Sequence, residues 1–275
     1  MSFTAHNILL DNGEKTVGNA MPLLAETADW NSIKKTINLF YPQHLNDYTN
    51  WKVADLGCLE GGYSVEFARM GFNTVGIEAR EENLINCNYV KSHVNLNNLT
   101  FIKDDARNIC NHGKFDITFC YGLLYHLNNP VEFLKTLSSC TNKMLLLHTH
   151  YAPENDYRYS LGTLNKKVLH RLEGRFKFLS DRKNYLLSKI TENEGYKGRW
   201  FDEYQQEEKN VKIEKMLWAS YNNYKSFWLL KEELVKALHL AGFNSVYEQF
   251  DYNKDLQQKN FTYYYSRSMF VAIKH

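Results

Sequence analysis

The sequence predicts an α/β fold, in which a mostly parallel β-sheet is covered by helices on both faces. Between residues 51 and 150, short apolar segments alternate with longer amphipathic ones, and this alternation is typical of a parallel sheet. The first apolar segment also runs into a glycine-rich turn at residues 57–62 and then into a helix start. Glycines let the backbone approach a ligand, and a helix start adds free N–H groups, so we expect a carboxylate or phosphate to bind there.

The first 50 residues precede the sheet, and we expect them to form an arm or lid. Residues 8–14 favour a short strand and turn, because Asp-Asn-Gly is typical of hairpins. Residues 28–41 predict a helix with one apolar face. The arm either packs over the core or closes over a bound ligand, with His6 among the polar groups that reach in.

The core elements then follow in order along the chain. Strands are expected at about 51–56, 73–78, 99–103, 115–120 and 143–148, and helices at 62–70, 81–93 and 130–140. A further helix is expected at 227–240, followed by strands at 245–250 and 263–273. Ligands of such sheets bind at the carboxyl ends of the strands, so candidate site residues are sought there.

Residues 151–225 interrupt the alternation, and we expect them to form an inserted, mainly helical cap. Basic residues outnumber acidic ones in this segment, which indicates either a solvated helix face or a phosphate-bearing acceptor. Within it, residues 193–203 are polar and aromatic and include two glycines, so we expect a loop there. Glu194, Arg199 and Trp200 of this stretch are candidate contacts to the acceptor.

Composition limits the classes of function. The chain has 275 residues, of which 44% are hydrophobic, and a formal net charge of +2. We therefore expect a packed core. We expect neither a nucleic-acid partner nor a membrane partner. The N-terminus lacks the pattern of a signal peptide, so we expect a cytoplasmic protein. The five cysteines have no C-x-x-C spacing, which favours reduced thiols over a disulfide or a zinc site.

Glu78 ends the second strand roughly 20 residues after the glycine turn, at a position where acids commonly accept hydrogen bonds from a ribose. With the glycine turn and this acid, the chain resembles the class I S-adenosylmethionine-dependent methyltransferases. Three further segments are similar to that family's third strand, its fourth strand with the active-site loop, and its turn into the sixth strand: residues 101–106, 115–127 and 241–246. The resemblance implies S-adenosylmethionine as cofactor and S-adenosylhomocysteine as product.

The resemblance also implies a Rossmann-like sheet of seven strands and a division of the chain. Residues 51–150 and 226–275 would form the core that binds S-adenosylmethionine, residues 1–50 the arm or lid, and residues 151–225 the cap. The expected partner is a small-molecule acceptor, which could bear a phosphate. Whether the protein is a monomer or a homodimer stays open.

Seven residues would contact the cofactor if the family's pattern holds. Asp55 would orient the ammonium of the methionine moiety, Gly57 would allow close approach, and Glu78 would accept both ribose hydroxyls. The others, at the ends of the third and fourth strands, are Asp104, Asp105, Ala106 and Tyr121. Which of the two neighbouring aspartates contacts adenine stays open.

Histidines are the candidate catalytic residues. A hydroxyl acceptor must lose a proton during methyl transfer, and histidine suits this role near neutral pH because its unperturbed pKa is about 6.5. His126 lies in the loop after the fourth strand, and His148 and His150 lie at the end of the fifth, so the three are expected to form one cluster. Tyr125 would contact the acceptor there. Few carboxylates are nearby, so no metal is expected.

We therefore predict O-methylation of a small polar molecule, such as a sugar, a sugar nucleotide or a natural-product intermediate. One alternative is modification of tRNA, because residues 122–126 are similar to a loop of the wobble-uridine carboxymethyltransferases, which use a carboxylated cofactor. N-methylation of a small molecule is another, since the nucleophile cannot be identified from the residues. A binding protein without activity is a third.

Overall fold

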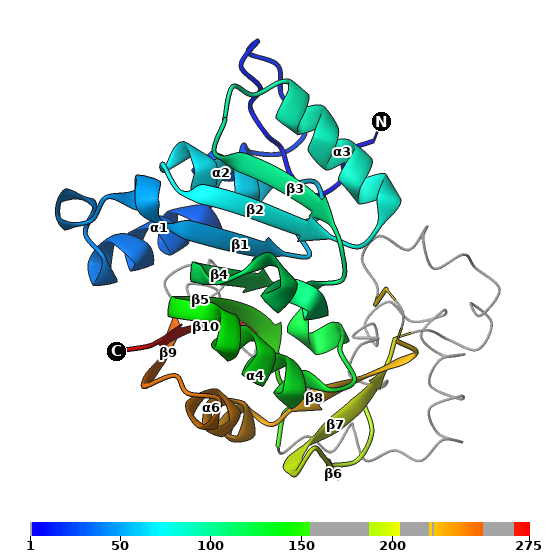
Figure 1. Cartoon of the computed structure of the whole chain (residues 1–275). Coiled ribbons are helices and arrows are strands. Elements are labelled where there is room, and N and C mark those ends of the chain that lie inside the picture. Colours follow the sequence, from blue (N-terminus) through cyan, green and yellow to red (C-terminus); the bar gives the residue numbers. More distant parts are fainter. Residues whose placement is uncertain (1, 155–186, 204–219, 222, 250–266) are drawn as a thin grey trace, which may run out of the picture.

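A seven-stranded sheet forms the middle layer of the computed structural model (Figure 1). The structure describes residues 2–154, 187–203, 220–221, 223–249 and 267–275. In the order in which they pair, the strands are β3 (Leu99–Lys103), β2 (Asn73–Glu78), β1 (Lys52–Leu56), β4 (Phe115–Tyr121), β5 (Thr141–His150), β10 (Arg267–Ile273) and β9 (Ser245–Gln249). β10 runs antiparallel to β5 and β9, and all the other pairs of the sheet are parallel. The predicted Rossmann-like fold class is therefore confirmed.

Helices cover both faces of this sheet (Figure 1). One face carries α1 (Ala28–Phe40), α2 (Gly62–Arg69) and α3 (Glu81–Ser92), and the other carries the 3-10 helix η4 (Ala106–His112), α4 (Pro130–Cys140) and α6 (Lys231–Leu240). Successive residues of β1 alternate between these two cores, as the pleat of a strand requires. Within the described part of the chain, no helix combines the length and apolar character needed to cross a bilayer.

The N-terminal arm lies along α2 and α3 (Figure 1). Its side chains Ile8 and Leu10 are buried against Val65 of α2 and Val90 of α3. The strand and turn expected at residues 8–14 are present as a turn closed by a single antiparallel bridge between Leu9 and Lys15.

The described part of the segment 151–225 forms strands, where the sequence predicts mainly helices and a loop. Strands β6 (Thr191–Asn193), β7 (Tyr196–Asp202) and β8 (Lys225–Leu229) make a separate antiparallel sheet. The supposed loop is a hairpin, because Glu194 and Gly195 have positive φ angles of 54° and 80° and form the two-residue turn that closes it. Residues 155–186 and 204–219 lie outside the described residues.

The helix expected at residues 227–240 begins only at Lys231, so its first turn was assigned wrongly. Phe227 and Leu229 face the main core, whereas Trp228 and Leu230 face a smaller cluster. A period of two is the pattern of a strand, and the four apolar residues in a row concealed it by continuing the apolar face of the helix.

One disulfide joins Cys110 of η4 to Cys140 of α4, whose Cα atoms lie 5.5 Å apart. The prediction of five reduced thiols is therefore wrong for these two. Spacing rules detect neighbouring pairs, whereas these two cysteines are separated by 30 residues and meet only because η4 packs beside α4. The other three cysteines, Cys58, Cys87 and Cys120, are free and buried, as expected.

Candidate active site

A cavity of about 500 Å³ opens at the carboxyl ends of β1, β2 and β4. The predicted site residues that line it are His6, Asp55, Gly57, Glu78, Asp105, Ala106, Tyr121, Tyr125 and His126. The predicted residues outside its lining are Asp104, His148, His150, Glu194, Arg199 and Trp200. The structure thus brings together one set of residues from five separate parts of the chain and leaves the others outside the lining.

Asp55 ends β1 beneath the glycine turn and is only 2% exposed. Its carboxylate accepts a hydrogen bond of 2.6 Å from the Ser64 hydroxyl of α2. Burial raises the pKa of Asp55 to about 7, against the opposing effect of the Ser64 hydrogen bonds, and the nearby charge of Glu78 raises it further. Gly57 follows with a φ of +65°, a conformation that glycine adopts without strain.

Glu78, at the end of β2, is held by two backbone donors. One carboxylate oxygen accepts from the Leu59 N–H at 2.9 Å, and the other accepts from the Arg80 N–H at 2.8 Å. Burial raises the pKa of Glu78, while these hydrogen bonds and the Arg80 charge oppose the increase. A carboxylate has about four acceptor positions, so these two backbone donors leave room for hydroxyl groups in the cavity.

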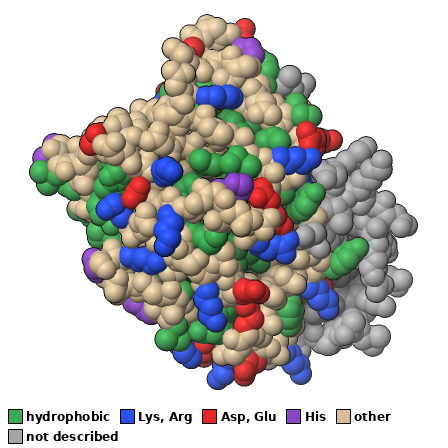
Figure 2. Space-filling model, in the orientation of Figure 1, with side chains coloured by type: hydrophobic (Ala, Val, Ile, Leu, Met, Phe, Trp, Pro, Cys, Tyr) green, Lys and Arg blue, Asp and Glu red, His purple; other side chains and the backbone are tan. Residues whose placement is uncertain are grey.

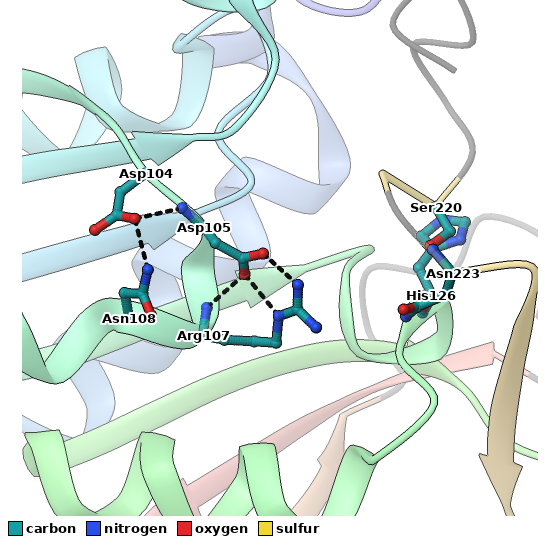
Figure 3. A network of polar contacts seen from close by, with 7 residues as sticks. All are labelled: Asp104, Asp105, Arg107, Asn108, His126, Ser220 and Asn223. Atoms are coloured by element: carbon teal, nitrogen blue, oxygen red, sulfur yellow. Dashed lines mark hydrogen bonds and ion pairs between the residues drawn. The ribbon is translucent and has the colours of Figure 1, made fainter. Parts of the chain in front are cut away.

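The structure distinguishes the two neighbouring aspartates that follow β3 (Figure 3). Asp105 lines the cavity and binds Arg107 through both oxygens, and its contacts with Arg107 lower the pKa of Asp105 although burial alone would raise it. Asp104 points toward Asn108, accepts its amide at 2.7 Å, and contacts His112 at 2.8 Å. Asp104 is therefore a structural residue of η4 in this arrangement, and Asp105 is the one placed for a ligand.

Tyr121, at the end of β4, lies in a group of side chains that the sequence did not indicate. Its hydroxyl donates to Asp29 of α1 at 2.7 Å, and its ring lies 5.1 Å from that of Tyr63. Burial raises the pKa of the Tyr121 hydroxyl, so it stays a donor at neutral pH. Asp29 and Tyr63 also line the cavity, and no local motif marks them.

His126 is paired with a carboxylate that holds its ring. Its Nδ1 lies 3.0 Å from both oxygens of Glu203, whose side chain is 2% exposed. The Asn223 amide donates to the His126 carbonyl at 2.9 Å, which fixes the loop, and Ser220 lies beside these two residues (Figure 3). Because a carboxylate only accepts, Nδ1 carries the proton and Nε2 keeps a lone pair. Glu203 is at the end of a stretch recognised as polar, but its role was not predicted.

Of the three histidines, His126 alone lines the cavity, whereas His148 and His150 contact the rings of the lining residues Tyr121 and Tyr125. His148 is buried with its ring stacked 4.0 Å from that of Tyr121, and burial lowers the pKa of His148 well below its usual value. His150 stacks on Trp228 at 4.6 Å. Strand β5 runs on to His150, two residues past its predicted end, so both histidines are packed strand residues rather than residues of a rim loop.

The three predicted acceptor contacts in the cap have structural contacts instead. Glu194 accepts from two backbone N–H groups at the start of α4, and Trp200 packs edge-on against Phe227 at 5.0 Å. The Arg199 guanidinium donates to three backbone carbonyls, those of Pro153, Glu154 and Ser188. These contacts hold the small sheet against the core, and they explain why polar residues occur there.

His6 reaches the cavity from the arm. Its Nδ1 accepts a hydrogen bond of 3.1 Å from the Gly62 N–H at the start of α2. Burial lowers the pKa of His6 to about 4, although Glu60 opposes this. A neutral imidazole that accepts at Nδ1 carries its proton on Nε2, so His6 is a hydrogen-bond donor rather than a base.

Comparisons with known proteins agree with this arrangement. Residues 48–217, more than half of the chain, match a family model described as a methyltransferase domain. The chain is 31% identical over 117 residues to the tRNA U34 carboxymethyltransferase of Campylobacter hominis, covering 42% of this chain and 40% of that protein. It is 29% identical over 105 residues to the mitochondrial ubiquinone biosynthesis O-methyltransferase of Arabidopsis thaliana, covering 36% and 32%. The matches thus span less than half of either relative.

Among solved structures, the chain resembles the N-terminal domain of EvdMO1. The structure determined in the presence of SAH and D-fucose has a TM-score of 0.61 and 19% identity, and it covers 98% of this chain and 90% of that one. The structure with SAH bound has a TM-score of 0.57 and 20% identity, covering 88% and 79%. At these identities the likeness establishes a shared fold.

Proposed function

Because the chain belongs to the class I S-adenosylmethionine-dependent methyltransferases, we propose that it methylates a hydroxyl of a small polar acceptor, with His126 as the general base. The observation that carries this proposal is the pairing of His126, which lines the same cavity as Asp55 and Glu78, with the Glu203 carboxylate, whose side chain is nearly buried.

The residues of the cavity fit S-adenosylmethionine. Glu78 has acceptor positions for the ribose hydroxyls. Asp105 and Ala106 line the same cavity and would contact the adenine attached to that ribose. Asp55 offers a carboxyl group to the ammonium of the methionine moiety, and the left-handed Gly57 leaves room beside it. When bound, the cofactor supplies a methyl group activated by its sulfonium.

The protein's part in the reaction is to position the acceptor and to take its proton. His126 accepts the hydroxyl proton at Nε2, because Nδ1 is already committed to Glu203. The Glu203 carboxylate then stabilises the imidazolium that forms. Tyr125, whose ring lies 4.2 Å from that of His126, packs beside the acceptor.

A second candidate function is carboxymethyl transfer to a tRNA wobble uridine. It is favoured by the similarity to the Campylobacter hominis enzyme. On the face shown in Figure 2, however, Lys and Arg side chains are scattered among acidic and uncharged ones rather than forming one continuous basic surface. Since phosphate contacts dominate affinity for nucleic acid, a small acceptor is the better supported choice.

The names of the similar proteins suggest acceptors for a direct test. S-adenosylhomocysteine formation would be followed by mass spectrometry with S-adenosylmethionine and either a hydroxylated ubiquinone precursor or D-fucose, and with carboxylated S-adenosylmethionine and bulk tRNA. With whichever acceptor is turned over, His126→Gln should lower kcat by about 100-fold or more, which is the usual contribution of a general base. Glu203→Gln should lower kcat less and shift its pH profile, because it acts through the imidazole.

The matched control is His44→Gln, which replaces an exposed histidine away from the cavity and should leave kcat unchanged. His148→Gln and His150→Gln should each lower kcat less than His126→Gln does. The assignment of the base would be wrong if His126→Gln kept activity within about threefold of wild type while one of the other two abolished it.

A further inference from the structure

The disulfide between Cys110 and Cys140 joins two elements that both line the cavity. Cys110 lies in η4, which contributes Ala106 and Arg107 to the lining. Cys140 ends α4, which contributes Phe133. The bond therefore crosslinks two parts of the cavity wall, and one of them lies where the adenine is proposed to bind.

Apart from this bond, few contacts hold η4 in place. Of its seven residues, only Ala106 and Ile109 are buried. Ile109 belongs to the same core cluster as Leu134 and Leu137 of α4, and the side chain of Asp104 bonds to two polar groups of η4. A 3-10 helix has poorer hydrogen-bond geometry than an α-helix, so such a short element has little stability of its own. The position of η4 thus depends strongly on the covalent link.

The bond is placed where a reductant can reach it. Cys110 is an exposed residue, whereas Cys140 is buried. A thiolate can therefore attack Sγ of Cys110, form a mixed disulfide with it and release the thiolate of Cys140. A second thiol of the reductant then frees Cys110. Two electrons and two protons thus pass from two reductant thiols to the pair, and the reductant becomes a disulfide.

The fold also accommodates the reduced pair. The Thr136 carbonyl oxygen lies 3.5 Å from Sγ of Cys110 and 3.2 Å from Sγ of Cys140. The Ser139 hydroxyl oxygen lies 3.2 Å from Sγ of Cys110. Each thiol formed on reduction therefore has a hydrogen-bond acceptor within reach. Because Ile109 keeps η4 beside α4, the two thiols stay close enough to form the bond again.

We propose that the disulfide between Cys110 and Cys140 is a reversible redox switch that sets the affinity of the cavity for its cofactor. With the bond closed, the start of η4 is held in place and binding is tight. When a dithiol or glutathione reduces the bond, η4 samples more positions, and binding weakens because it must order this wall again. The inference rests on the proposed function for the position of the cofactor.

Isothermal titration calorimetry with S-adenosylhomocysteine tests the switch. Wild type is titrated once without reductant and once after reduction with dithiothreitol, and peptide mass mapping after alkylation verifies the state of each cysteine. Reduction should weaken binding by about fivefold or more, the lower end of usual coupling between two sites. Amide exchange at residues 105–112 should become faster on reduction, whereas exchange in β1 should stay unchanged.

Cys110→Ser removes the bond at an exposed position and should bind like reduced wild type, within about twofold, with or without dithiothreitol. This variant keeps Cys58, Cys87 and Cys120, which are free in wild type. A response to dithiothreitol that persists in the variant would come from those three cysteines and would contradict the assignment. The matched control is Ser139→Ala, which removes the neighbouring hydroxyl but keeps the bond, and it should behave like oxidised wild type.

The reverse effect gives an independent readout. Wild type is equilibrated in mixtures of reduced and oxidised dithiothreitol, then quenched in acid, alkylated after denaturation and analysed by mass spectrometry. Saturating S-adenosylhomocysteine should make the bond harder to reduce by the same factor by which reduction weakens binding, because coupling between two equilibria is reciprocal.

The switch is ruled out if the oxidised and reduced forms bind S-adenosylhomocysteine equally, since the disulfide would then be structural only. Failure of both forms to bind would instead contradict the proposed function. Amide exchange at residues 105–112 would then decide by itself: faster exchange on reduction would support control of η4 by the bond, and unchanged exchange would overturn it.

Discussion

At the scale of single residues, Asp55 couples ligand binding to pH. Its pKa of about 7, raised by burial, means that the free protein carries a protonated Asp55 below pH 7. A bound ammonium favours the ionised carboxylate, so ligand binding must release a proton at lower pH. The affinity for S-adenosylmethionine should therefore rise as the pH increases from 5 to about 7 and level off above it.

Calorimetry in buffers of different ionisation enthalpy measures this proton release directly. Wild type should release up to about one proton per ligand at pH 6 and almost none at pH 8.5. Asp55→Asn cannot ionise and should abolish the difference, whereas Ser64→Ala removes a hydrogen bond that favours the ionised form and should move the transition to higher pH. Proton release that is independent of pH would contradict the assigned role of Asp55.

In two histidines of the cavity, the hydrogen-bond partner of Nδ1 determines whether Nε2 is a donor or an acceptor. The Gly62 N–H makes His6 a donor at Nε2, whereas Glu203 makes His126 an acceptor at Nε2. Sequence position placed both residues near the ligand, but the protonated nitrogen of each ring could not be predicted, because the partners lie 56 and 77 residues away.

At the scale of elements, the Glu60 side chain holds the arm at the glycine turn, in addition to the bond between His6 and Gly62. The buried Glu60 accepts backbone N–H groups of Thr4, Ala5 and His6 at 2.6, 3.1 and 2.9 Å. This clamp carries His6 into the cavity, so the order of the arm and the shape of the site depend on the same carboxylate.

Glu60→Ala should release the arm. Three backbone donors would lose a charged acceptor, so we expect a loss of at least about 2 kcal/mol of stability locally and faster amide exchange at residues 4–6. Affinity for S-adenosylhomocysteine should fall as His6 is withdrawn. Glu233→Ala, which breaks a pair with Lys236 on α6 at the other face of the sheet, serves as control, and equal exchange in both variants would exclude the clamp.

The small sheet shows where sequence patterns are insufficient. The hairpin β6–β7 depends on a two-residue turn at Glu194 and Gly195, and the same Glu194 accepts two N–H groups of α4. A Glu with a positive φ is an uncommon turn residue, so the stretch resembles a loop until its long-range partner is known.

At the scale of the whole molecule, the sheet was predictable and the acceptor side was not. Alternating apolar strands, the glycine turn, and acids such as Asp55 and Glu78 are local signals, so the order of the core and one end of the cavity followed from them. Asp29, Glu203 and Arg267 come from the arm, the small sheet and the last strand. They meet only through folding, so no spacing in the sequence reveals them.

The central claim is that this cavity binds S-adenosylmethionine at Glu78 and Asp55, and titration with S-adenosylhomocysteine tests it most directly. Wild type should bind with micromolar affinity, and Glu78→Ala should weaken binding by about tenfold or more, because two charge-assisted hydrogen bonds to the ribose are lost. Folding of the variant would be verified by its thermal unfolding. A well-folded wild type that fails to bind, or binding that Glu78→Ala leaves unchanged, would contradict the account.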